Sequence, residues 1–208
     1  MATRTRLSPE ERRAQLLDLG AELFAAHPYE DVHIEAVAET AGVSRGLLYH
    51  YFPNKRAFLA ALLQRSSAEI LAATTPDPAL GPLEQLNRGI ELYLTYCEAN
   101  KHASRAVHRG AASADPEVLE ILERAVQVQE QRIVDALEPD RKAHPLLVIA
   151  VRSWIMFQRT VCQEWLESPQ VTLADARDLC VNTLVGAVAN LPEKARPKLV
   201  AELLLPQD

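Results

Sequence analysis

The sequence predicts an all-α protein, and three observations support this fold class. Apolar residues recur every three or four positions in nearly every segment, which is the spacing of one helix face. Proline, serine, threonine and aspartate stand where these segments begin, as at helix starts. No segment alternates apolar and polar residues in the manner of a half-buried strand. We therefore expect only helices and the turns that join them.

The amino-acid composition limits the classes of protein to which this chain can belong. The 208 residues are 48% hydrophobic and 24% charged, enough to bury a core. No window holds about 18 consecutive apolar residues, and the N-terminus lacks an apolar signal region, so we predict a cytoplasmic protein without a membrane span. The cysteines Cys97, Cys162 and Cys180 are far apart and show no C-x-x-C spacing. We expect reduced, mostly buried thiols.

The first helix is predicted from its start and stop signals. Ser8 caps it, Pro9 takes its first position, and Glu11 completes a capping box. His27 and the proline after it end the helix. The arm over residues 2–6 carries two arginines, and two interpretations stay open: a disordered leader, or an arm that reaches DNA.

Residues 34–52 predict a helix-turn-helix. Apolar positions at helical spacing precede Gly42, which tolerates the turn, and Ser44 caps a second short helix with Leu47 or Leu48 facing inward. The outward positions of this second helix are Arg45, Tyr49, His50 and Tyr51. Such a helix enters the DNA major groove. The alternative is a helical hairpin that touches no nucleic acid, but the gathering of tyrosine, histidine and basic residues favours DNA.

A long helix over residues 54–73 follows, with Lys55 and Arg56 in its first turn. Lys55 either contacts a DNA phosphate, which we favour, or is solvated surface charge. Residues 74–82 hold three prolines and a glycine, the clearest break in composition. We predict a helix-turn-helix domain over 1–53 and a larger helical effector-binding and dimerisation domain over 54–208, with helix 54–73 connecting the two.

The remainder of the chain predicts further helices. One follows an Asp115 cap, with Val128 among its inward positions, and a short helix follows the last long one. The segment from Pro145 is apolar nearly all round and must be covered on all sides. In the last long helix Leu179 is expected to face inward. Its far face is expected to carry Val181, Val185, Gly186 and Ala189. Spare apolar surface on these two long C-terminal helices predicts a homodimer.

Residues 16–63 resemble the TetR family of transcriptional regulators. The resemblance rests on I-x-x-V-A-E-x-A-G-V-S-R-G-x-L-Y-x-Y-F followed by N-K-x-x-F-L. It implies a DNA-binding surface formed by His33, Ser44, Arg45, Gly46, Leu47, Tyr49, His50, Tyr51 and Lys55. His33 is expected at the N-cap of the helix before the turn, where relatives usually have threonine or serine. Histidine caps a helix poorly, although it can donate to a phosphate. Leu47 is also more apolar than usual, and either contacts a thymine methyl or is buried.

An effector pocket is predicted in the helices after the proline-rich segment. Its candidate residues are aromatic, sulphur-bearing or amide side chains: Tyr93, Tyr96, Cys97, Trp154, Phe157, Gln158, Cys162 and Trp165. A mostly apolar pocket with a few polar groups suits a small hydrophobic effector. The alternative is that these side chains are plain core. No catalytic motif, metal-ligand spacing or phosphate-binding loop is recognised, so we predict no enzyme activity, no metal and no cofactor.

Together these observations predict a sequence-specific DNA-binding regulator. We expect a homodimeric repressor that a small, largely hydrophobic effector releases from a palindromic DNA operator. The alternative is a helical ligand-binding or adaptor protein with a vestigial helix-turn-helix, which the net charge of −6 would suit.

Overall fold

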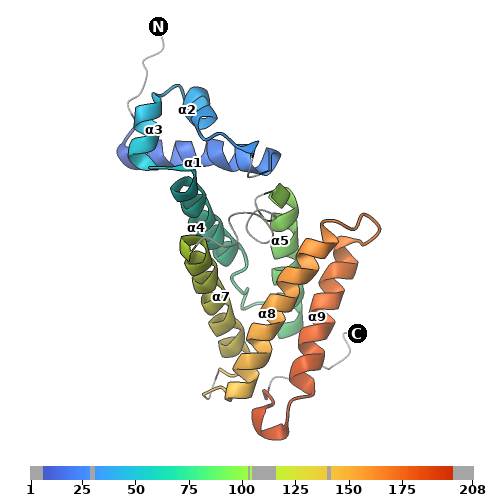
Figure 1. Ribbon diagram of the computed structural model, residues 1–208. Coiled ribbons are helices and arrows are strands. Elements are labelled where there is room, and N and C mark those ends of the chain that lie inside the picture. Colours follow the sequence, from blue (N-terminus) through green and yellow to red (C-terminus); the bar gives the residue numbers. More distant parts are fainter. Residues whose placement is uncertain (1–6, 29–30, 103, 105–115, 140–141, 199–208) are drawn as a thin grey trace. The chain divides into compact units, whose positions relative to one another are not determined.

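The computed structural model describes residues 7–28, 31–102, 104, 116–139 and 142–198 (Figure 1). All regular structure within these ranges is helical, so the predicted all-α class is confirmed. The elements are α1 (Pro9–Ala26), α2 (Glu35–Ala41), α3 (Arg45–Tyr51), α4 (Lys55–Ala73), α5 (Pro82–Ala99), α7 (Pro116–Leu137), α8 (Pro145–Trp165), α9 (Leu173–Ala189) and the 3-10 turn η3 (Glu193–Ala195).

The described residues form two compact units. The first takes its residues from 1–66 and 100–121, and the second from 67–99 and 122–208. Helices α4 and α7 each run from one unit into the other. The functional division after residue 53 stays a prediction. The arm over 2–6, the Asp115 cap and most of the predicted C-terminal helix lie outside the described residues.

The first unit is built around the ring of Phe58, which is fully buried on α4. The ring of Phe52 stands edge-on at 4.5 Å between centroids, and that of Phe24 on α1 stacks at 6.2 Å. A Cβ built on Gly20 of α1 would overlap the Phe58 ring, so α1 and α4 approach as closely as a glycine allows. These contacts give the helix-turn-helix a rigid base.

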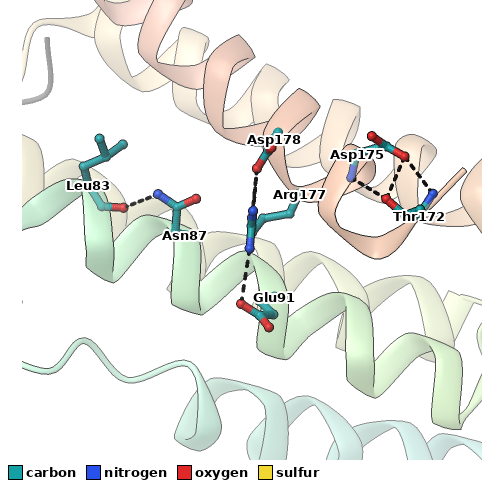
Figure 2. A network of polar contacts seen from close by, with 7 residues as sticks. All are labelled: Leu83, Asn87, Glu91, Thr172, Asp175, Arg177 and Asp178. Atoms are coloured by element: carbon teal, nitrogen blue, oxygen red, sulfur yellow. Dashed lines mark hydrogen bonds and ion pairs between the residues drawn. The ribbon is translucent and has the colours of Figure 1, made fainter. Parts of the chain in front are cut away.

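Local capping signals set the helix ends as the sequence predicts. Ser8 accepts the Glu11 N–H at 3.2 Å while the Glu11 carboxylate accepts the Ser8 N–H at 2.7 Å, so the capping box before α1 is confirmed. Thr172 and Asp175 form the same reciprocal pair before α9 (Figure 2). Because these bonds satisfy N–H groups that have no partner inside the helix, the start of each helix is specified within four residues.

In the second unit, α9 packs against both α5 and α8 (Figure 1). The three cysteines are buried here as free thiols, as expected. Two predictions about α9 are wrong, because Val181 is buried at 5% exposure whereas Leu179 is 51% exposed. Helix α9 packs against both α5 and α8, so its buried arc is wider than a single stripe and turns Leu179 outward.

The apolar face of α7 also differs from the prediction. Val128 was expected to face inward but is 43% exposed, while Val126 and Val134 are buried. These two valines and Leu137 belong to the core of the second unit. Valines two residues apart on a helix lie about 200° apart around its axis, so only one of Val126 and Val128 can face the core.

Ion pairs tie neighbouring helices of the second unit together. Figure 2 shows Arg177 of α9 between Asp178, at 2.8 Å, and Glu91 of α5, at 3.6 Å. Arg152 of α8 pairs with Glu123 and with Glu130 of α7, the latter at 3.2 Å. These pairs are partly exposed, so each contributes little stability, but they select one alignment of the helices.

Helix α8 is long and apolar enough to cross a membrane by length and composition alone. One of its faces nevertheless belongs to the core of the second unit, through Leu147, Val151 and Ile155. Arg152, in the same helix, is ion-paired to α7. Core helices of globular units pass the same compositional test.

Candidate nucleic-acid interface and ligand cavity

The turn between α2 and α3 depends on Gly42. Its φ of 65° and ψ of 36° lie in the left-handed region, where a side chain is strained. Its N–H donates to the Glu39 carbonyl at 3.1 Å, and the Val43 N–H donates to the Ala38 carbonyl at 2.9 Å. These bonds close the C-terminus of α2 and redirect the chain, as the sequence predicted.

Helix α3 is anchored on one face only. The Ser44 hydroxyl accepts the Leu47 N–H at 3.2 Å, confirming the predicted cap, and Leu48 is fully buried. The opposite face is outward: Arg45, Gly46, Tyr49 and His50 are exposed, whereas Leu47 and Tyr51 are half-buried. The exposed residues of α3 among the predicted DNA contacts therefore lie on the side of the helix opposite the buried Leu48.

Two acidic residues of α2 hold this face. The Tyr49 hydroxyl donates to the Glu35 carboxylate, and Arg45 pairs with Glu39 at 3.2 Å. The hydrogen bond from Tyr49 lowers the pKa of Glu35 and raises the pKa of Tyr49. These two partners were not predicted from the sequence. The sequence held one indication of these pairs, which is the matching spacing of the partners. Glu35 and Glu39 are four residues apart on α2, and Arg45 and Tyr49 are four residues apart on α3.

The two remaining predicted DNA contacts lie at helix starts. The N-cap of α2 is Ile34, with no side-chain cap, so the predicted cap position of His33 is wrong by one residue. The exposed His33 instead accepts the Ala36 N–H through its carbonyl, at 3.0 Å. Lys55 is the half-buried first residue of α4, beside Asn54, whose side chain accepts the Ala57 N–H at 2.8 Å. Its position suits a phosphate contact.

A cavity of about 320 Å³ opens inside the second unit. Its walls come from the segment after α4, the first half of α5, the second half of α7, and the middle of α8 and α9. The lining residues are Thr74, Pro76, Pro82, Gln85, Leu86, Gly89, Ile90, Gln129, Arg132, Ile133, Ala136, Leu137, Trp154, Gln158 and Leu184. This volume and mostly apolar lining are typical of small-molecule sites.

Of the predicted pocket residues, Trp154 and Gln158 line this cavity. The other six predicted residues do not line it. Phe157 is the neighbour of Gln158 in α8, and the remaining five lie beyond the cavity along α5 and α8: Tyr93, Tyr96, Cys97, Cys162 and Trp165. Burial raises the pKa of Tyr93 well above its ordinary value, with Cys97 and Cys162 close by, so these groups form a neutral core cluster. Arg132 and Gln129 also line the cavity, from one face of α7, and were not predicted from the sequence.

The polar groups of the cavity differ in how they are satisfied. The Trp154 indole donates to the Cys180 carbonyl at 2.8 Å. Gln158 is only 2% exposed, and its carboxamide has no hydrogen-bond partner in the described part of the chain. A buried polar group left this way costs about 1–3 kcal/mol. Arg132, the only charged residue among the lining residues, donates one bond to the Leu71 carbonyl.

The arrangement of the first unit defines a helix-turn-helix fold. The profile of the bacterial regulatory proteins of the tetR family matches residues 16–62, which cover most of α1, the turn and the first part of α4. The chain is 26% identical over 185 residues to the transcriptional repressor KstR of Rhodococcus jostii, covering 88% of this chain and 87% of that protein. It is 27% identical to the transcriptional activator FasR of Mycolicibacterium smegmatis, covering 70% and 68%.

The fold extends this likeness over the whole chain. A crystal structure of a tetR-family transcriptional regulator from Streptomyces coelicolor superposes with a TM-score of 0.87 at 27% identity, covering 97% of this chain and 93% of that one. The chain belongs to the TetR family of bacterial regulatory proteins.

Proposed function

We propose that this protein is a sequence-specific DNA-binding transcriptional regulator, a repressor that a small, largely hydrophobic effector releases from a palindromic operator. The observation that carries the proposal is the outward face of α3, held after the Gly42 turn by the buried Leu48. Arg45 and His50 on this face can reach base edges, while Tyr49 and Lys55 suit phosphates. His33 adds a donor beside them.

A second copy supplies the other half-site. Exposed apolar side chains gather on the two long C-terminal helices: Leu146, Ile149 and Met156 on α8, and Leu179 on α9. Residues 149 and 156 are seven apart and share one helix face. A two-fold pairing of α8 and α9 covers these side chains and presents two copies of α3 to half-sites about 34–36 Å apart, or a multiple.

The effector acts through the cavity of the second unit. A ligand shifts the equilibrium only if it binds the DNA-free state more tightly than the DNA-bound state. The cavity is lined by residues of the second unit, and none of them is among the proposed DNA contacts. Release from DNA is therefore allosteric rather than competitive.

A mobility-shift assay on DNA selected from the source genome tests the proposal. Lys55→Ala and Tyr49→Ala should each weaken operator binding. Lys55→Ala should reduce the slope of log K against log salt by about 2, because each dimer loses two phosphate contacts. Lys194→Ala, an exposed lysine of η3, is the matched control and should change neither. Wild-type protein that prefers no fragment over random DNA would refute the proposal.

The dimer has its own test. Ile149→Glu on α8 or Leu179→Glu on α9 should give a monomer in sedimentation and abolish operator binding. Val128→Glu on α7, which is 43% exposed, is the matched control and should leave the mass unchanged. Dimers that persist in both interface variants would contradict this interface.

A reporter gene placed under the control of the selected operator tests whether the protein represses or activates transcription. Because the relatives include a repressor and an activator, deletion of the regulator is informative either way. Expression should rise on deletion for a repressor. A protein that dimerises and binds ligand but has no DNA affinity would instead be a helical ligand-binding protein with a vestigial helix-turn-helix.

A further inference from the structure

We propose that the cavity of the second unit binds an amphipathic carboxylic acid, with the acid head held by Gln158 and Arg132 and the apolar body against α5 and α7. This inference rests on the proposed function only in treating the ligand as the effector. It goes further in assigning the chemical class of the ligand and the residues that select it.

Gln158 gives the first argument. Its carboxamide offers two N–H donors and one carbonyl acceptor. The Gln158 side chain is only 2% exposed and lines the cavity. It has no hydrogen-bond partner among the described residues. Buried amides in folded proteins are nearly always hydrogen-bonded. A ligand oxygen in the cavity completes this group.

Arg132 gives the second argument. It is the only charged residue among the described residues that line the cavity, and no carboxylate among the described residues pairs with it. Its one hydrogen bond goes to the Leu71 carbonyl in the last turn of α4, which leaves other N–H donors of the guanidinium unused. An arginine fork matches a carboxylate better than it matches a hydroxyl or an amide.

The other residues that line the cavity indicate that the rest of the ligand is apolar. Leu86, Ile90 and Ile133 are apolar, and a Cβ built on Gly89 of α5 meets no atom within 4 Å. The open space beside Gly89 therefore belongs to the ligand. Half-buried Gln129 adds a further amide to the same wall as Arg132. An apolar molecule without a head group would leave these polar groups unsatisfied.

A matched probe series tests the head group on the full-length protein. Isothermal titration calorimetry compares decanoic acid, decanamide and decanol, which share one chain and differ in the head. Decanoic acid should bind at least tenfold more tightly than either neutral probe. Equal binding of all three probes, or binding of none, would overturn the proposal.

Variants then test the assigned residues. Gln158→Met keeps the side-chain length but removes the amide, and Arg132→Gln removes the charge. Each should weaken decanoic acid binding about tenfold and reduce the preference over decanol, whereas Arg132→Lys should retain part of it. Unchanged acid preference in both Gln158→Met and Arg132→Gln would overturn the assignment.

Occupancy of the cavity is tested at Gly89. Gly89→Phe should fill the open space and abolish binding of the acid. Thr95→Phe, at an exposed position of α5 outside the cavity lining, is the matched control and should bind it normally. Undiminished binding in folded Gly89→Phe would place the acid elsewhere and overturn the proposal. Because these titrations contain no DNA, the acid site and the proposed regulator function can fail independently of each other.

Discussion

Gly20 and Gly89 both lie inside helices, yet their surroundings are opposite. A Cβ at Gly20 would overlap the Phe58 ring, whereas a Cβ at Gly89 meets no atom within 4 Å. The first glycine permits close packing of α1 on α4 in the unit that carries the DNA-binding face. The second borders the cavity of the other unit. The same residue type therefore permits close packing in the first unit and borders the proposed ligand cavity in the second.

This difference matches the function that we propose for each unit. Base readout requires α3 to be held within a fraction of an ångström, and a close-packed base of aromatic rings provides that. An effector site requires unfilled volume and polar groups that still lack partners, which lowers stability until the ligand binds. Substitutions at matched positions in the two units should separate these requirements.

Phe58→Ala should have the largest effect. Removing a fully buried ring that contacts two other rings should lower the free energy of unfolding by about 3–5 kcal/mol. Urea unfolding followed by circular dichroism measures it. Phe157→Ala, at a half-buried site of the second unit, should cost clearly less; equal losses would contradict the contrast in packing.

Substitution of alanine for Gly20 and for Gly89 should change the free energy of unfolding in opposite directions. Gly20→Ala should lower the free energy of unfolding by about 1–3 kcal/mol through overpacking, while Gly89→Ala should raise it by up to about 1 kcal/mol through helix propensity. Thermal unfolding of both variants checks this. Adding Phe58→Leu to Gly20→Ala should recover part of the lost stability. A Gly20→Ala protein as stable as wild type would disprove the close approach of α1 to the Phe58 ring.

Gln158→Met should stabilise the ligand-free protein. The change removes an unpartnered buried amide and should raise the free energy of unfolding by roughly 1 kcal/mol. Gln163→Met, one and a half turns along α8 at a half-buried site, is the control and should stay within about 0.5 kcal/mol. A destabilised Gln158→Met protein would mean that the amide is satisfied in solution.

The smallest effect is expected at Tyr49. Its hydrogen bond lowers the pKa of Glu35, so the resulting stability is present above the ordinary glutamate pKa and is lost as pH falls through the lowered value. The same bond raises the pKa of Tyr49, so stability is also lost at high pH. Tyr49→Phe should differ from wild type near neutrality and converge with it at both extremes. Unfolding curves across pH check this, and a constant difference would exclude the bond.

Glu35→Gln addresses the same pair from the side of DNA binding. Removing one carboxylate next to the outward face of α3 should lower repulsion with phosphates and tighten operator binding severalfold. Glu117→Gln, an exposed acidic residue at the start of α7, is the control for net charge. Weaker binding of Glu35→Gln would show instead that Glu35 positions Tyr49 for its contact.

Local signals predicted the first unit well. The Ser8 capping box, the Gly42 turn and the Ser44 cap are each decided by residues within about four positions, and the structure has all of them. The cap of α2 was misplaced by one residue, because neither His33 nor Ile34 supplies a side-chain cap and the backbone turn alone starts that helix.

Features that depend on neighbouring helices were predicted less well. Periodicity alone did not show that α9 packs on both α5 and α8, which buries Val181 and exposes Leu179. It also did not show which turns of α5 and α8 border empty space, so only Trp154 and Gln158 among the predicted pocket residues line the cavity. A cavity exists where side chains of several helices fail to meet, and that is not encoded in any one helix.

The sequence by itself determined that this protein is helical, where its helix-turn-helix lies, and which family it resembles, because these follow from short-range capping, turn and spacing rules. Tertiary structure alone decided the pairing of Glu35 with Tyr49, the close approach at Gly20 and the unpartnered amide of Gln158. Each of these depends on the distance between residues that are remote along the chain, and only the packed helices set that distance.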